Sequence, residues 1–478
     1  MNSAATASTK QAAALSFATQ ICTQAINLGL SVLFVRLAAP DCVGLFTLLL
    51  ASARLVSSLG RLGMNYSFAV LLPRQVDATA QFRLTTTYSL FGLTSSLLVA
   101  AAALWQLAHT KGMSTAWHSQ FWLFGALTLA YLLSDSLSEI LWSIQLALGR
   151  FRAVFLRDVW LALGKGVLPL AGALWLGSLG MVVGLGLISL LNCWIAAALL
   201  RGLPLAKAAQ QQAGVLSWPL LKQLLAKGLP FFSVPLVNNL ILWPLLLKVV
   251  NGAGIDRLDG LRVAQICAQL IGILSGSLIP VLWVKSSHDE HSAERMHKRA
   301  FQICWVVSIV IYCLYALSDT TLLPLVFGKS ASEGAIQVAR ILVVAAAVQG
   351  LSQIPMQRPL PTSTLIRLSG LQIGSLILAA FAAIHLFNPA AGLMAYASVN
   401  LISPLLTVLL LPALLRQRLV AEDFSALPLT LLSALLLSTC FLGQSGVLQT
   451  LQTVLLLGSL AVVLISNREL LLELKPGR

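Results

Sequence analysis

The sequence consists largely of apolar runs of about twenty residues joined by short connections, and about twenty residues is the length that crosses the hydrocarbon core of a bilayer. Hydrophobic residues occupy 58% of the 478 positions, and the mean hydropathy is +0.87. Charged residues occupy only 10%, whereas a soluble domain carries roughly 25%. Because a single segment in lipid must satisfy its own backbone hydrogen bonds, we predict an all-α, polytopic membrane protein.

About fourteen transmembrane helices are predicted from these runs. Their approximate bounds are 12–35, 44–64, 82–107, 120–147, 153–176, 179–200, 218–248, 260–284, 300–317, 335–355, 366–386, 389–415, 427–442 and 446–466. Most of the 31 Lys and Arg residues fall in connections on the side of the N-terminus, which predicts that both termini are cytoplasmic. This distribution accounts for the net charge of +15 without a nucleic-acid partner.

The chain is predicted to contain two pseudo-symmetric six-helix bundles, 1–200 and 218–415. A cytoplasmic linker, 201–217, joins them, and 416–478 adds two helices and a cytoplasmic tail. A weak repeat supports this division: "APDCVGLFTLLLASARLV" and "GIDRLDGLRVAQICAQLIGIL" occupy equivalent positions in the two halves. Two such bundles, related by an axis along the membrane normal, would enclose a cleft of the kind in which transporters place their substrate site.

The first bundle carries charges at membrane depth. Arg54 and Arg61 are seven residues apart and share one helix face, with Arg61 nearer the cytoplasmic end. An arginine at mid-bilayer costs about 2.5–3.5 kcal/mol on insertion scales, so such residues usually have a function. Lys165 lies in the middle of the fifth predicted span, and Asp135 and Glu139 share one face of the fourth.

Two interpretations of these charges are open. In the first, Arg54, Arg61 and Lys165 line a hydrated, net-positive cavity, and Asp135 and Glu139 tune its charge or couple it to an ion. In the second, the charges form a buried structural network that pairs Arg54 with Asp135 and Lys165 with Glu139. The two can coexist.

The second bundle offers a weaker set of candidates. Asn238 and Asn239 lie among three prolines in the seventh predicted span, which is typical of a bending gate. Asn400 could join them in holding a cation, and Arg262 lies near the outer end of the eighth span. No carboxylate lies in the predicted second-half spans, which argues against a sodium site there.

The sequence shows no nucleophile elbow, HExxH, P-loop or dinucleotide-binding motif. We therefore expect neither an enzyme nor a cofactor or metal site. Without an ATPase motif, transport would draw on an ion gradient, the membrane potential or the gradient of the substrate.

The stretch "FVRLAAPDCVGLFTLLLASARLVSSLGRLGMNYSFAVLLPR" resembles the first-loop and second-span signature of polysaccharide (O-antigen type) flippases. This family belongs to the multidrug/oligosaccharidyl-lipid/polysaccharide exporter superfamily. The matching positions are Arg36-Leu37, Pro40-Asp41, Gly44-Leu45-Phe46, Leu62-Gly63 and Arg74. "ALGRFRAVFLRDVW" and "LLPLVFGKS" are similar to two further elements of the family.

The resemblance implies a multi-pass protein of the bacterial inner membrane that flips an undecaprenyl-pyrophosphate-linked oligosaccharide from the inner to the outer leaflet. Its implied partners are the membrane, this lipid-linked substrate, a coupling cation and the glycan polymerase machinery. Arg54, with Arg61 and Lys165, would hold the pyrophosphate, since arginine binds phosphate oxygens in a bidentate manner and stays charged. The scarcity of charge in the second half leaves the coupling ion open.

Other functions remain as alternatives. A multidrug or cation antiporter of the same superfamily should favour acidic intramembrane sites, yet Asp135 and Glu139 are outnumbered by the cations. A second alternative is that the protein is a lipid II flippase of the same fold. A membrane glycan polymerase or ligase would need catalytic residues on a sizeable outer loop, and the predicted outer connections are short. A purely structural scaffold would not explain charge at mid-depth.

Overall fold

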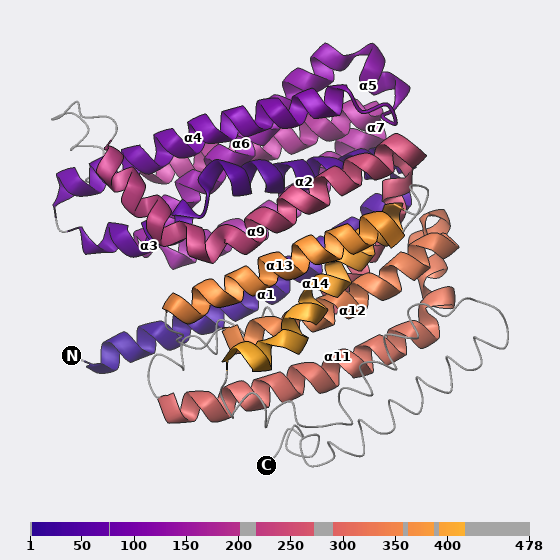
Figure 1. The fold of residues 1–478 in the computed structure, drawn as a ribbon. Coiled ribbons are helices and arrows are strands. Elements are labelled where there is room, and N and C mark those ends of the chain that lie inside the picture. Colours follow the sequence, from indigo (N-terminus) through magenta and orange to yellow (C-terminus); the bar gives the residue numbers. More distant parts are fainter. Residues whose placement is uncertain are drawn as a thin grey trace. The chain divides into compact units, whose positions relative to one another are not determined.

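The computed structural model describes residues 2–75, 77–200, 217–271, 290–356, 362–386 and 392–415 (Figure 1). These ranges are mostly helical and contain no strand. Nine of the described helices are long and apolar enough to cross a bilayer, which confirms the predicted all-α, polytopic fold class. The predicted linker 201–217, apart from Ser217, and the predicted segment 416–478 lie outside the described residues.

The chain divides into two compact units. The first comprises Ala14–Asp259 and Ala380–Tyr396, and the second comprises Met1–Ala13, Gly260–Ala379 and Ala397–Arg478. In chain order the long helices are α1 (Asn2–Leu37), α2 (Pro40–Arg61), α4 (Ala78–Ala108), α6 (Phe121–Ala147), α7 (Phe151–Leu200), α9 (Trp218–Ala253), α11 (Glu290–Phe327), α12 (Glu333–Met356), α13 (Thr362–Leu386) and α14 (Gly392–Leu415). Two short helices, α3 (Met64–Leu71) and α5 (Thr115–Ser119), lie between them, with 3-10 turns at Leu72–Arg74, Ile255–Arg257 and Gly328–Ser330.

The second predicted span ends earlier than expected. Leu62 (φ 43°) and Gly63 (φ 76°) adopt left-handed conformations, which end α2 at Arg61 and start α3 in a new direction. Gly63 also lies so close to the Gly228 carbonyl of α9 that a side chain there would overlap it. Asn65 therefore lies on α3 and not on the helix that carries Arg54.

Helix α2 is the central element of the first unit. It packs against α4, α6, α7 and α9, and it is the most buried of the nine candidate spans (Figure 1). Hydroxyl groups join it to α9, where Trp243 Nε1 donates to Ser52 Oγ at 3.0 Å and Asn239 Nδ2 donates to Ser58 Oγ at 3.1 Å. Such interhelical hydrogen bonds replace the hydrophobic driving force that lipid does not provide.

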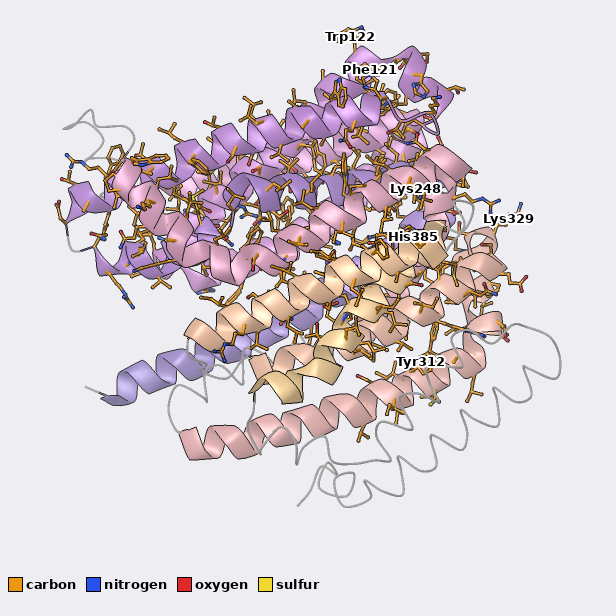
Figure 2. All side chains as sticks on the ribbon, in the orientation of Figure 1. Phe121, Trp122, Lys248, Tyr312, Lys329 and His385 are labelled. Carbon is orange, nitrogen blue, oxygen red and sulfur yellow. The ribbon has the colours of Figure 1, made fainter. Side chains whose placement is uncertain are left out.

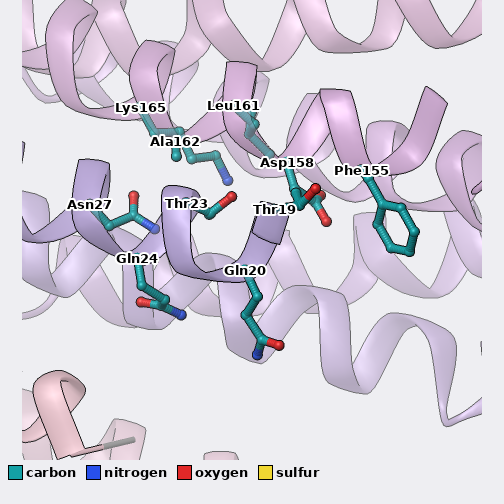
Figure 3. A pocket seen from close by; sticks show the side chains of 10 residues that line it. All are labelled: Thr19, Gln20, Thr23, Gln24, Asn27, Phe155, Asp158, Leu161, Ala162 and Lys165. Atoms are coloured by element: carbon teal, nitrogen blue, oxygen red, sulfur yellow. The ribbon is translucent and has the colours of Figure 1, made fainter. Parts of the chain in front are cut away.

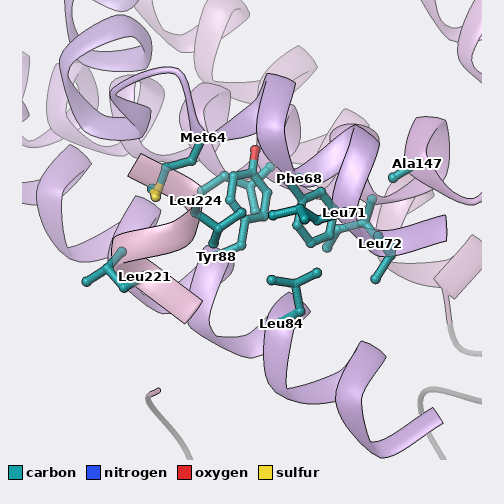
Figure 4. Packing of buried hydrophobic residues seen from close by; sticks show 11 residues of the cluster. Met64, Phe68, Leu71, Leu72, Leu84, Tyr88, Ala147, Leu221 and Leu224 are labelled. Carbon is teal, nitrogen blue, oxygen red and sulfur yellow. The ribbon is translucent and has the colours of Figure 1, made fainter. Parts of the chain in front are cut away.

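An apolar cluster closes one end of this unit. It joins α3, α4, α6 and the start of α9, and its members include Met64, Phe68, Leu71, Leu72, Leu84, Tyr88, Ile140, Ile144, Ala147, Leu221 and Leu224 (Figure 4). Phe68 and Tyr88 stack with their ring centroids 4.3 Å apart, and Ser67 Oγ donates to the Leu224 carbonyl at 2.7 Å. The cluster holds the start of α9 against the helices of the N-terminal segment.

Exposed tryptophans lie near the ends of several helices. Trp122 near the start of α6 is 88% exposed and points away from the bundle (Figure 2). Trp105 near the end of α4 and Trp175 beside the turn of α7 are also exposed. This placement is typical of the aromatic belts at membrane–water interfaces, and it agrees with a multi-pass membrane protein.

Helix α7 is a hairpin of two antiparallel helices. Its only non-helical residue is Gly177 (φ 60°, ψ −142°), which falls between the predicted spans 153–176 and 179–200. Gly172 approaches Gly180 across the hairpin, and Gly184 approaches Leu168 one turn further from the bend. Small residues at these positions let the two backbones meet closely, as is common between membrane helices.

We expect Gly180→Ala to lower the free energy of unfolding by about 2 kcal/mol, because its Cβ would overlap the Gly172 carbonyl oxygen and force the hairpin apart. Gly186→Ala is the matched control, since the same helix leaves open space there. Denaturant titration in detergent measures both variants. Equal stability of the two variants would contradict the close packing of the hairpin.

Candidate functional site

One stripe of α2 is open, although the rest of the helix is packed. Between Asp41 and Arg61, Arg54 alone is exposed. Partly exposed residues lie at helical spacing on the same side, namely Leu50, Ala51, Ser57 and Arg61, and Leu59 is the one further partly exposed residue in between. Arg54 lies about 10 Å along the helix from Arg61, at 1.5 Å per residue. The face shared by the two arginines, predicted from their spacing, is therefore the open face of α2.

Arg54 and Arg61 differ in their contacts. Within the described residues, Arg54 makes no hydrogen bond or ion pair. Arg61 donates from Nε to the Ser57 carbonyl at 3.0 Å, hydrogen-bonds the Ser57 hydroxyl, and lies 3.8 Å from a carboxylate oxygen of Glu139. Its side chain is 11% exposed. The donors of Arg54 are thus available, whereas those of Arg61 are largely engaged.

Behind this stripe, the charges of the first unit form a chain of ion pairs. Glu139 on α6 accepts a hydrogen bond from Arg157 on α7, in addition to its contact with Arg61. Arg157 also donates to Asp158 at 3.3 Å, and its guanidinium lies over the Trp142 ring at 5.5 Å from the centroid. Its side chain is only 9% exposed. Each charge in this chain has an opposite charge beside it.

Lys165 belongs to a second pair. Its Nζ donates to Asp135 Oδ1 at 2.7 Å, and Ser189 Oγ donates to the same oxygen at 3.4 Å. The expected pairing of Arg54 with Asp135 and Lys165 with Glu139 is therefore wrong: Asp135 pairs with Lys165, and Glu139 pairs with Arg157 and Arg61. The sequence placed the acids on one face of α6, but it did not determine which cation each acid meets.

The sequence analysis does not single out Arg157 as a site residue: it lies near the start of the predicted span 153–176 and counts there as one of the basic residues of the cytoplasmic side. The structure places it inside the span Arg152–Leu200. Its spacing from Lys165 is two helical turns, which puts both cations on the side of α7 that faces α6. This periodicity was the available signal.

A cavity of about 370 Å³ lies between α1 and α7 in the same unit (Figure 3). Its lining from α1 is polar, and its lining from α7 mixes apolar and charged side chains. The residues are Thr19, Gln20, Thr23, Gln24 and Asn27 from α1, and Phe155, Asp158, Leu161, Ala162 and Lys165 from α7. Neither glutamine of α1 makes a side-chain hydrogen bond within the described residues.

The remaining candidates are dispersed. Asn239 hydrogen-bonds Ser58 in the first unit, and Asn238 is partly exposed beside it on α9. In the second unit, Arg262 is 7% exposed and Asn400 lies partly exposed on α14. No three His, Cys, Asp or Glu side chains gather as a metal site would require in the part of the chain that the structure describes.

The second unit also holds an unexpected carboxylate. Asp319 on α11 is fully buried and accepts a hydrogen bond from Arg340 Nη2 on α12 at 2.9 Å. The expectation that second-half spans carry no acid is wrong, because the ninth span continues to Ser330 instead of ending at 317. Arg340 is thus buried in an ion pair, not anchored at the interface.

The comparisons with known proteins show a shared fold. The lipid II flippase MurJ in an inward-closed conformation matches with a TM-score of 0.65 and 13% identity over 96% of this chain and 99% of that one. An outward-facing multidrug resistance MATE family transporter of the MOP superfamily matches with a TM-score of 0.56 and 15% identity over 86% of this chain and 96% of that one. A eukaryotic MATE transporter matches with a TM-score of 0.51 and 14% identity over 87% of this chain and 98% of that one. No protein-family model and no curated protein sequence matches the chain.

We expect Glu139→Gln to lower the free energy of unfolding by about 3 kcal/mol, since it removes the carboxylate that two largely buried guanidinium groups share. Combining it with Arg157→Gln in a double-mutant cycle should give a coupling energy above about 1 kcal/mol. Asp158→Asn is the control, because its carboxylate is 42% exposed and should matter less. Additive effects of Glu139→Gln and Arg157→Gln would show that this ion pair does not contribute to stability.

Proposed function

We propose that the protein is a flippase that moves a polyprenyl-pyrophosphate-linked oligosaccharide from the inner to the outer leaflet for cell-surface polysaccharide assembly. It would act by alternating access through a cavity that Arg54 lines. The observation that carries this proposal is the open guanidinium of Arg54, which has no hydrogen bond or ion pair among the described residues and lies on the most buried of the nine candidate spans. An arginine at this depth needs water or an anion to offset its cost in lipid.

The chemistry of the substrate fits this residue. A pyrophosphate offers oxygens that a guanidinium binds with two parallel hydrogen bonds, and such charge-assisted bonds are stronger than neutral ones. Of the three cations predicted to hold it, Arg61 and Lys165 are engaged by Ser57, Glu139 and Asp135. We therefore assign the main phosphate contact to Arg54, with Arg61 adding positive potential from the same face.

The pairing of the acids argues against an antiporter for cationic drugs. Such a transporter needs an available carboxylate at membrane depth. Asp135 and Glu139 are each held by a cation, so neither offers an uncompensated negative charge. Although MATE transporters share the fold, the MurJ structure has the higher TM-score and covers more of this chain.

Lipid II is the second candidate substrate, and the likeness to the MurJ flippase over nearly the whole chain favours it. The two substrates share a polyprenyl pyrophosphate and differ in their head groups. A flipping assay in proteoliposomes with each lipid separates them, and so does complementation of strains that lack one flippase or the other.

We expect Arg54→Ala to slow flipping of the lipid-linked oligosaccharide by about tenfold to a hundredfold, which corresponds to the loss of charge-assisted hydrogen bonds. Arg54→Lys should retain part of the rate, because lysine keeps the charge but cannot form the fork. Quenching of a fluorescent lipid in the outer leaflet of proteoliposomes measures the rate.

Lys248→Ala on α9 is the matched control, since this lysine is exposed and has no ion pair among the described residues. It should leave the rate unchanged. Wild-type flipping by Arg54→Ala would remove Arg54 from the mechanism and, with it, the main support for this proposal.

A further inference from the structure

The cavity between α1 and α7 is a polar site inside the membrane part of the first unit. Thr19, Thr23 and Asn27 repeat every four residues along α1, and Gln20 and Gln24 follow them one position later. Consequently one side of α1 presents hydroxyl and amide groups over more than two helical turns. Figure 3 shows Phe155 at one end of the cavity and Lys165 with Asn27 at the other.

The amides of this stripe lack a partner among the residues that the structure describes. The side chains of Gln20, Gln24 and Asn27 make no hydrogen bond within the described residues, and the Thr23 hydroxyl is buried without one. Polar groups without partners are costly at membrane depth. The stripe therefore requires water or a ligand that both donates and accepts hydrogen bonds.

The charges at the cavity are compensated. Lys165 is paired with Asp135 at 2.7 Å, and Asp158 is paired with Arg157 at 3.3 Å. A free anion or cation would have to displace one of these pairs, whereas a neutral ligand would not. The volume of about 370 Å³ lies in the range of roughly 300–1,000 Å³ that is usual for small-molecule sites.

We infer that this cavity is a subsite for a neutral, hydroxyl-rich group, namely a sugar unit of the lipid-linked oligosaccharide. The inference rests on the proposed function, and it places the sugar apart from the phosphate contact at Arg54. Amides and hydroxyls match sugar hydroxyls because each can donate and accept. The carboxylate of Asp158 adds an acceptor, and Phe155 places an apolar side chain at one end of the cavity.

The test compares two fluorescent lipids in proteoliposomes: undecaprenyl pyrophosphate that carries a disaccharide, and undecaprenyl pyrophosphate without sugar. The variant combines Gln24→Leu with Asn27→Leu, and Gln106→Leu on α4 is the control because Gln106 is exposed outside the cavity. We expect the variant to slow flipping of the glycosylated lipid by about tenfold, since it loses two hydrogen-bonding groups. The sugarless lipid should flip at the wild-type rate, whereas Arg54→Ala should slow both.

Two outcomes would overturn the subsite. One is an unchanged rate for the glycosylated lipid, and the other is an equal slowing of both lipids, which would indicate a structural role. In either case Arg54→Ala still tests the proposed function separately.

Protection from alkylation gives a second readout that does not depend on flipping. Gln20→Cys, made in a Cys22→Ser background because Cys22 is exposed, is labelled with a maleimide in nanodiscs. The glycosylated lipid should slow labelling and the sugarless lipid should not. This result would support the subsite even if the wild-type protein moved neither lipid, and equal labelling with both lipids would refute it.

Discussion

A charge inside an apolar span must be paired, hydrated or held by a ligand, and the first unit is organised around this constraint. Its ion pairs bring α2, α6 and α7 together, with Glu139 between Arg61 and Arg157 and with Asp135 on Lys165. Because these charges are satisfied within the protein, they stabilise one arrangement of the helices. Among the described residues Arg54 makes no ion pair with this network, and this is the basis of the functional role that we propose for its charge.

The packing of α2 explains why Arg54 can be open without destabilising the bundle. Every other side of the helix is held, by α4, α6 and α7 and by the hydrogen bonds of Ser52 and Ser58 to α9. The left-handed turn at Leu62 and Gly63 then fixes where the helix ends and keeps Arg61 near Glu139. A guanidinium on so firmly held a helix is pre-organised for an anion, which reduces the entropy lost on binding.

The spans could be predicted well from the sequence, because lipid forces each apolar run of sufficient length to be a helix. Helix faces were also predictable, as the open stripe with Arg54 and Arg61 shows. The ion-pair partners could not be predicted, because periodicity gives the face on which a residue lies but not the rotation of the neighbouring helix. Glu139 therefore pairs with Arg157 and not with Lys165. Asp319 was missed because hydropathy underestimated the length of α11, where a buried pair with Arg340 offsets the charge.

The two proposed contacts of the substrate differ in chemistry as its two parts do. In the proposal, the charged pyrophosphate would meet Arg54, a cation without an ion pair among the described residues, and the neutral sugar would meet amides beside compensated charges. The chain of ion pairs runs from Asp158 at the cavity through Arg157 and Glu139 to Arg61 on the open stripe of α2. Since every member of this chain is engaged, we propose that it holds the proposed sugar-binding face of α7 and the proposed phosphate-binding face of α2 at a constant separation. Such rigidity suits a substrate whose two parts are joined by one covalent bond, because both contacts then form in a single bound position.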